Sequence, residues 1–102
     1  MPEWIDVAAE GDVAEDGVLA VNAADEELAL FKLGGEVFAL VDRCSHGAAR
    51  LSDGYIEDGC VECPLHQGLV DIRSGEPRAE PIVAAIRRFP ARIRNGRIEV
   101  EL

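Results

Sequence analysis

Two glycine-containing dipeptides, each between short apolar segments, constrain the fold of this chain more than any other feature. Gly34-Gly35 and Asn95-Gly96 have the composition of two-residue β-hairpin loops, because glycine and asparagine accept the positive φ angles that tight hairpin turns need. The sequence therefore predicts two antiparallel strand pairs, one in each half of the chain. The four predicted strands are LALFKL (28–33), EVFALV (36–41), PARIR (90–94) and RIEVEL (97–102).

Other short apolar segments extend this pattern. WIDVA (4–8) and GVLAVNA (17–23) read as strands, and PIVAAIRRF (81–89) as a strand or a short helix bounded by prolines. No window of eleven or more residues has convincing helical periodicity. Several short strands with frequent turns predict an all-β antiparallel sandwich or barrel.

The 102 residues suit a single domain. Between residues 43 and 70 the apolar periodicity weakens and glycines become frequent. We therefore expect one domain, 1–102, with basal strands in about 1–42 and 71–102 and a loop-rich insert in about 43–70.

The net charge of −10 is concentrated in the first part of the chain, where residues 1–42 hold eleven Asp and Glu against Lys32 alone. This balance argues against nucleic acid as a partner, because no basic surface is available to release counterions. The acidic part is either a solvated surface or a means of steering the protein toward a basic partner.

No apolar run approaches the roughly 20 residues of a membrane span, and the start of the chain lacks the pattern of a signal peptide. We expect a cytoplasmic protein without a membrane partner, whose cysteines are reduced and available as ligands.

Residues 44–66 contain all three cysteines and both histidines of the chain. Cys44 and His46 are two residues apart, Cys63 and His66 are three apart, and sixteen residues separate the two pairs. Two such loops facing each other would supply two sulfur and two nitrogen ligands to a metal. The candidate ligands are therefore Cys44, His46, Cys63 and His66.

Two other interpretations of these residues remain open at this point. Two Cys and two His suit tetrahedral zinc, but structural zinc motifs usually pair like ligands locally, whereas each arm here holds one of each kind. That mixed pairing suits a dinuclear iron cluster. The segment from Cys60 to Cys63 is a C-x-x-C, but it lacks the strand-to-helix context of a thioredoxin motif. Cys60 is most simply a small apolar residue on a strand.

The C-x-H and C-x-x-H pairs, within CSHGAARLSDG and ECPLHQG, resemble the Rieske family, and in particular the soluble Rieske ferredoxins of bacterial aromatic-ring-hydroxylating dioxygenases. The resemblance implies a Rieske-type fold with an inserted cluster-binding subdomain and one 2Fe–2S cluster. Cys44 and Cys63 would bind one iron, and His46 and His66 the other.

Departures from the wider family indicate the subfamily. Respiratory and photosynthetic members brace the cluster with a disulfide, and Ala49 and Leu65 occupy those positions here. Their hydroxyl donors to the cluster sulfurs have no counterpart in the stretch that follows His66. Fewer such hydrogen bonds predict a reduction potential in the lower part of the Rieske range of about −150 to +300 mV.

The resemblance implies an electron carrier and not an enzyme. Both histidines are already assigned, so none remains for the two-His-one-carboxylate iron site of an oxygenase. We expect a one-electron carrier, a monomer, between an NAD(P)H-dependent flavoprotein reductase and a terminal oxygenase. The alternatives are a Rieske-type small subunit of a nitrite reductase and a zinc-stabilised interaction module.

Overall fold

The structure, a computed structural model, describes residues 3–43, 49–64, 68–79 and 85–102. Its regular elements there are eleven strands and two single-turn 3-10 helices, η1 (Glu10–Asp12) and η2 (Leu51–Asp53). Every strand pairing is antiparallel, which confirms the predicted all-β class. The strands are β1 (Trp4–Ala9), β2 (Val18–Ala23), β3 (Glu26–Leu33), β4 (Glu36–Val41), β5 (Tyr55–Glu57), β6 (Cys60–Glu62), β7 (Leu69–Asp71), β8 (Pro77–Ala79), β9 (Arg88–Phe89), β10 (Ala91–Arg94) and β11 (Arg97–Glu101).

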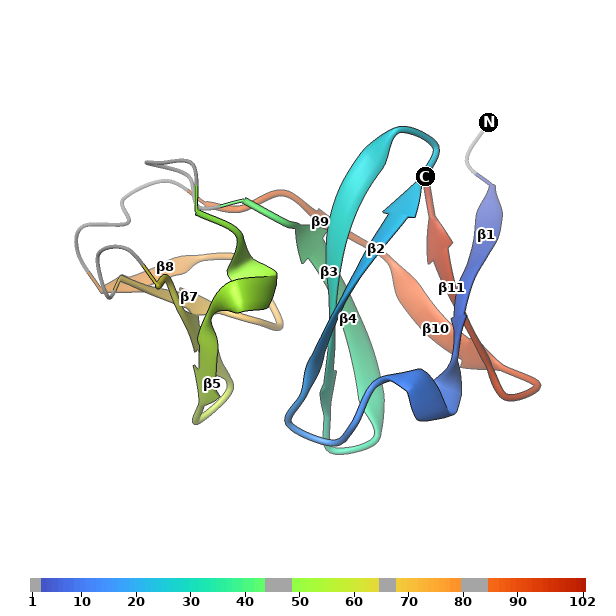
Figure 1. The fold of residues 1–102 in the computed structure, drawn as a ribbon, viewed down its shortest axis with the longest axis horizontal. Helices are drawn as coiled ribbons and strands as arrows, with labels where there is room; N and C mark the ends of the chain where they lie inside the picture. The colour runs from blue at the N-terminus through green and yellow to red at the C-terminus, as the bar shows by residue number, and fades with distance from the viewer. Residues whose placement is uncertain (1–2, 44–48, 65–67, 80–84) are drawn as a thin grey trace.

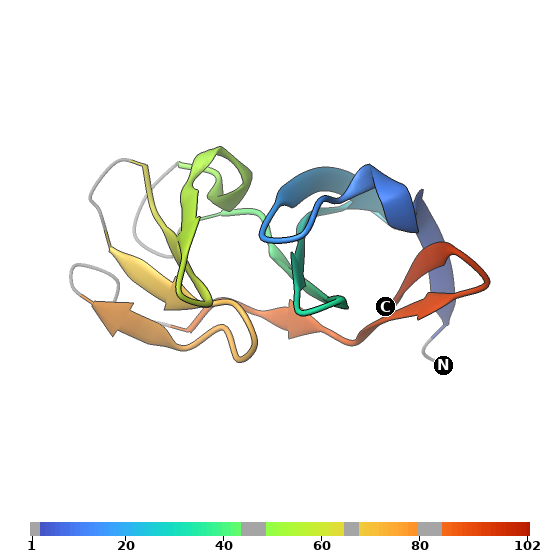
Figure 2. The same cartoon turned by 90° about the horizontal axis from the view of Figure 1, so that it is seen from below.

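The strands form three sheets, in the orders β1-β11-β10, β2-β3-β4-β9 and β5-β6-β7-β8. The first two sheets curve toward one another, with β1 beside β2 and β10 beside β4. Figures 1 and 2 show the third sheet at the opposite end of the elongated molecule. The chain therefore has a basal body and a smaller lobe.

Strand β3 is the centre of the core because it is buried on both faces. Ala29 and Phe31 belong to the apolar cluster shared with the third sheet, whereas Leu28 and Leu30 belong to the cluster shared with the first sheet. The run LALF therefore has no polar alternation, as expected for a strand that is covered on each side. Replacing Phe31 with a smaller residue would remove packing between the two lobes.

The predicted hairpins are confirmed. Gly34 and Gly35 have φ angles of 59° and 79° between β3 and β4, and Asn95 and Gly96 have φ angles of 52° and 76° between β10 and β11. Glu15 contributes to the first turn, because its carboxylate accepts hydrogen bonds from the backbone N–H groups of both glycines. Positive φ at both central residues matches the right-handed twist of the flanking strands.

Two further hairpins have turns that the sequence analysis did not single out. Asp58-Gly59 joins β5 to β6, and Ala24-Asp25 joins β2 to β3. Ala24 adopts a φ of 47° although alanine is unfavourable in this left-handed conformation.

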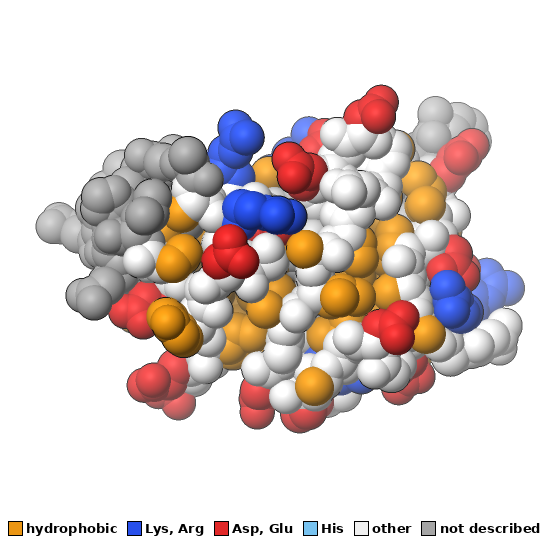
Figure 3. Space-filling model, in the orientation of Figure 1, with side chains coloured by type: hydrophobic (Ala, Val, Ile, Leu, Met, Phe, Trp, Pro, Cys, Tyr) orange, Lys and Arg blue, Asp and Glu red, His pale blue; other side chains and the backbone are white. Residues whose placement is uncertain are grey.

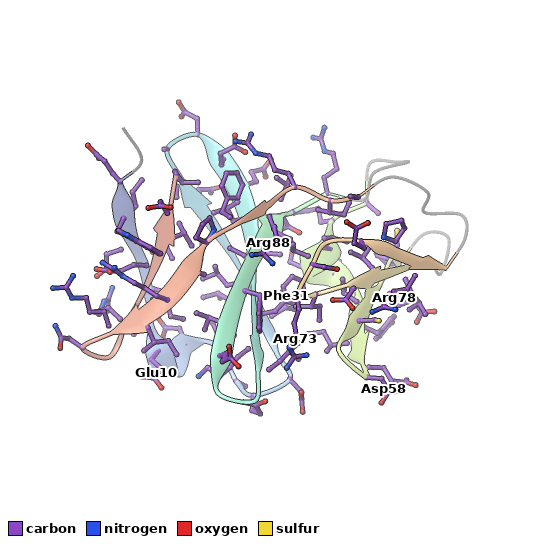
Figure 4. All side chains as sticks on the ribbon, turned by 180° about the vertical axis from the view of Figure 1, so that it is seen from behind. Glu10, Phe31, Asp58, Arg73, Arg78 and Arg88 are labelled. Carbon is purple, nitrogen blue, oxygen red and sulfur yellow. The ribbon has the colours of Figure 1, made fainter. Side chains whose placement is uncertain are left out.

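The third sheet continues beyond the region that the sequence marks as loop-rich. Strand β7 pairs with β6 on one side and β8 on the other, so the sheet reaches Ala79, past residue 70. Arg73, in the turn after β7, connects the two lobes. Its guanidinium stacks over the ring of Phe38 on β4, and its carbonyl oxygen accepts a hydrogen bond of 2.6 Å from Arg88 (Figure 4).

Only the last part of the segment 81–89, predicted as a strand or a short helix, can be assessed. Strand β9 occupies Arg88–Phe89 and pairs with β4, whereas residues 80–84 lie outside the described residues. Among the residues that the structure describes, no helix is long and apolar enough to cross a membrane.

Candidate metal centre

In the sequence, the predicted ligands lie in two segments, one between β4 and η2 and the other between β6 and β7. Cys63 directly follows β6 and is the one candidate ligand within the described residues. Cys44, His46 and His66 lie outside them, as do Leu65, Gln67 and Pro81. The described residues that flank these positions show how the chain approaches the site.

Cys63 is fully buried, and its backbone closes the segment that also carries His66. The Cys63 N–H donates a hydrogen bond of 2.8 Å to the carbonyl oxygen of Gly68, across the segment between β6 and β7. Cys63 belongs to the same apolar cluster as Leu51, and Ala49 packs against that cluster. The chain that leaves the first predicted ligand segment therefore lies beside the start of the second.

Gly54 allows the backbone to pass close to β6 just before Cys63. A Cβ atom on Gly54 would lie 2.2 Å from the carbonyl oxygen of Glu62 and 3.1 Å from that of Leu51. Any side chain at this position would displace the backbone next to Cys63. Gly54 is thus required by packing between η2 and β6, not by an unusual φ angle.

Asp42 organises the other side of the site, between β4 and the first predicted ligand segment. Its carboxylate accepts hydrogen bonds from the backbone N–H of Ser52 (2.7 Å) and from the Ser52 hydroxyl (2.6 Å), and Arg50 Nη2 lies 3.3 Å away. The Asp42 side chain has no solvent exposure. Asp42 was not among the predicted site residues, although an aspartate directly after an apolar strand is a signal to search for its partners.

Asp71 stabilises the turn between β7 and β8. Its carboxylate accepts hydrogen bonds from the backbone N–H groups of Arg73 and Ser74. It also forms an ion pair with Arg78, whose Nη2 lies 2.6 Å from Asp71 Oδ2. The hydrogen bond from Arg78 is the main reason why the pKa of Asp71 is lowered. This turn positions Gly75, whose carbonyl oxygen accepts a hydrogen bond from the Ile86 N–H.

Cys60, in contrast to Cys63, is not fully buried. It lies half-buried on β6, opposite Glu57 on β5 and Asp71 on β7, and its thiol is free. Desolvation raises the pKa of the Cys60 thiol. These features agree with the prediction that Cys60 is a packing residue.

Comparison with protein families matches residues 3–90 to the "Rieske [2Fe-2S] domain". The chain belongs to the Rieske family. The match covers the basal strands as well as the two predicted ligand segments, so it concerns the whole fold and not a short motif. It confirms the predicted 2Fe–2S cluster, and this family offers no support for the zinc interpretation.

The curated relatives of this Rieske protein are ferredoxins, and the match covers nearly the whole length of each chain. It is 50% identical to the anthranilate 1,2-dioxygenase ferredoxin subunit of Burkholderia cepacia, covering 100% of this chain and 94% of the relative. It is 41% identical to the ferredoxin component of the naphthalene 1,2-dioxygenase system of Pseudomonas putida, covering 98% and 96%. These relatives confirm the prediction of an electron-transfer component, not a catalytic subunit, and favour it over a nitrite reductase subunit.

Solved structures confirm the Rieske-type fold. The Sphingomonas yanoikuyae B1 ferredoxin superposes with a TM-score of 0.92 at 31% identity, covering 98% of this chain and 99% of that one. The ferredoxin fold also matches in a complex of reduced oxygenase and oxidised ferredoxin of carbazole 1,9a-dioxygenase, with a TM-score of 0.89, 30% identity and coverage of 95% and 91%.

The described residues fit a cluster at this place. A 2Fe–2S cluster of this type needs cysteine sulfurs held in a shielded environment and histidines on adjoining loops. Cys63 is buried, while Asp42 and Gly68 mark the ends of the two segments that carry the other candidate ligands. The bound cluster supplies a site that accepts and returns one electron.

Proposed function

We propose that Cys44 and Cys63 bind one iron of the 2Fe–2S cluster and that His46 and His66 bind the other. The observation that carries this assignment is the pairing of one cysteine with one histidine in each segment, in a chain that matches the Rieske family from residue 3 to 90. The burial of Cys63, in contrast to half-buried Cys60, supports the choice between the two neighbouring cysteines.

Histidine ligation sets the range of the reduction potential of this carrier. Two neutral imidazoles in place of two thiolates remove negative charge from the iron they bind, which favours its reduction. Rieske centres therefore have potentials of about −150 to +300 mV, against about −400 mV for plant-type ferredoxins. The protein would accept an electron from a flavoprotein reductase that oxidises NAD(P)H and deliver it to the terminal oxygenase of an aromatic dioxygenase system.

The names of the relatives support a role for this protein as electron donor to a terminal oxygenase. One solved relative is a ferredoxin in complex with its oxygenase, and the curated relatives belong to dioxygenase systems for aromatic compounds. The 50% identity to the anthranilate ferredoxin makes an anthranilate-type oxygenase the first partner to test. We propose a monomer in the cytoplasm, with brief contacts to each partner.

The acidic surface fits a partner with basic residues around its own redox centre. Figure 3 shows acidic side chains distributed over much of the face in view. Most acidic residues of the first part of the chain are exposed, including Glu10, Glu15 and Asp25. Long-range attraction of this kind accelerates encounter and weakens as salt screens it.

The experiment is reconstitution of electron transfer with purified components. NADH, a flavoprotein ferredoxin reductase and the oxygenase component of an anthranilate 1,2-dioxygenase system are combined with and without this protein. The expected result is NADH-dependent oxygenase turnover that requires this protein and slows as ionic strength rises. Failure to accept electrons from the reductase or to reduce the oxygenase, by a protein that holds its cluster, would contradict the proposal.

A further inference from the structure

Asp42 is the one buried charged residue in the described part of the chain, with a side chain wholly shielded from solvent. Moving a carboxylate from water into a protein interior costs free energy unless hydrogen bonds and an opposite charge compensate. An apolar residue after β4 would avoid this cost. The arrangement of its partners indicates what the carboxylate does.

Among the described residues, the partners of the Asp42 carboxylate come from beyond the first proposed ligand segment. Asp42 precedes Cys44, whereas Arg50 and Ser52 follow the segment that carries Cys44 and His46. The Ser52 N–H donates to one oxygen of Asp42 (2.7 Å), and the Ser52 hydroxyl donates to the other (2.6 Å), where Arg50 also approaches to 3.3 Å. Both carboxylate oxygens are therefore used to join the two ends of one loop.

The joined ends are anchored on the basal body as well. The backbone N–H of Asp42 donates to the carbonyl oxygen of Glu27 on β3 at 2.9 Å. Leu51, between the two partner residues, is fully buried in the apolar cluster that includes Cys63. The base of the first ligand segment is thus fixed relative to β3 and to the start of the second segment.

We propose that Asp42 is a positioning residue for the cluster. By closing the base of the segment between residues 42 and 50, its carboxylate restricts the conformations open to Cys44 and His46 and favours those that bind iron. Closing a loop at its ends removes conformational entropy from the loop before the iron binds. The inference rests on the ligand set proposed above.

The test uses the cluster-containing protein and three substitutions. Asp42→Asn keeps the shape but replaces one acceptor oxygen by an amide and removes the charge that faces Arg50. Ser52→Ala removes the hydroxyl and leaves the backbone donor in place. Asp53→Asn is the matched control, because Asp53 is exposed, directly follows Ser52 and loses the same charge as Asp42 on this substitution. Two readouts are needed, iron release to a chelator and the electron paramagnetic resonance spectrum of the reduced protein.

We expect Asp42→Asn to release iron about 10-fold faster than wild type, because the amide loses one acceptor oxygen for Ser52 and the charge that faces Arg50. Its resonance spectrum should also be broadened or shifted, because the ligands on the first segment are less restrained. Ser52→Ala should change both readouts in the same direction but less, and Asp53→Asn should change neither.

The results that would refute a positioning role for Asp42 differ from those that would refute the proposed ligand set. Asp42→Asn with a wild-type spectrum, whether or not release is faster, would show that the carboxylate only stabilises the fold. If Asp42→Asn does not fold, Ser52→Ala decides, and equality with Asp53→Asn would overturn the proposal. A wild-type protein that binds no iron would instead refute the proposed ligand set and function.

Discussion

Gly54 and Glu62 lie so close that a single added methyl group at position 54 would overlap the carbonyl oxygen of Glu62, at 2.2 Å. Glu62 ends β6 and Cys63 follows it, so this close approach restrains the backbone next to the second proposed ligand segment. The glycine therefore bears on the metal centre although it is no ligand.

Substitution of Gly54 should disturb the cluster and the fold together. Gly54→Ala should lower the free energy of unfolding by about 1–3 kcal/mol, the usual cost of overpacking, and lower the iron content of the purified protein. Gly11→Ala is the control, because within the described residues no atom beyond its chain neighbours lies within 4 Å of a Cβ at that exposed position. Iron content and unfolding temperature of Gly54→Ala equal to those of Gly11→Ala would contradict this account.

Asp71 should stay ionised at a more acidic pH than an ordinary aspartate. The hydrogen bond from Arg78 lowers the pKa of Asp71 in the folded protein from its ordinary value of 3.8, with further contributions from the Ser74 and Arg73 N–H groups. A carbon-detected NMR titration of the Asp71 carboxyl measures this directly. Arg78→Gln should raise the pKa of Asp71 toward 3.8, and no change on that substitution would exclude Arg78 as the cause.

The sign of the effect on stability follows from that lowered pKa. Above 3.8 the carboxylate is ionised in both the folded and the unfolded chain, and its contribution is fully present. As the pH falls through 3.8 and then through the lower folded value, the contribution is lost. Asp71→Asn should therefore cost about 1–3 kcal/mol near neutral pH and progressively less in acid. A cost that does not shrink as the pH falls would contradict this reasoning.

Ala24 offers a stabilising substitution away from the metal centre. Its φ of 47° costs an alanine roughly 1 kcal/mol, whereas asparagine tolerates that conformation. Ala24→Asn should raise the unfolding temperature by about 4–8 °C for each kcal/mol gained in a domain of this size. Asn95→Ala, which makes the reverse change in the hairpin between β10 and β11, should lower it by a similar amount. Shifts of the same sign in both variants would refute the turn assignment.

Substitution of Cys60, which is not a proposed ligand, tests whether Cys63 has been correctly chosen as the ligand. Because its thiol is free and it lies half-buried on β6, Cys60→Ala should retain the iron content and the spectrum of the wild type. Cys63→Ala should lose the cluster. Loss of iron from Cys60→Ala with retention in Cys63→Ala would show that the two cysteines have been exchanged in our assignment.

The long strands and their turns could be predicted because their signals are local. β3, β4, β10 and β11 are flanked by Gly34-Gly35 and Asn95-Gly96, whose φ requirements are readable from residue type alone. The turn at Ala24-Asp25 carries no such signal, since the pairing of β2 with β3 overrides the preference of alanine. The three-residue strands of the third sheet are too short to show any periodicity, so the extent of that sheet was not predictable.

The sequence indicates candidate ligands for a metal centre, but not the contacts that support the segments carrying them. The cysteine and histidine spacing indicates a metal centre from sequence alone, and the family match agrees with it. The bond between Asp42 and Ser52 and the contact of Gly54 with Glu62 depend on how separate segments pack. Residue type does not encode such contacts, and they became visible only in the folded chain.

The most direct test of the central claim, a 2Fe–2S cluster with two cysteine and two histidine ligands, is the electron paramagnetic resonance spectrum of the reduced protein, recorded with its iron and zinc content. The claim predicts a red-brown protein with iron, a Rieske-type signal that both His46→Ala and His66→Ala abolish, and a potential in the lower part of the range of about −150 to +300 mV. A colourless protein with stoichiometric zinc, or a Rieske-type signal that survives either substitution, would contradict it.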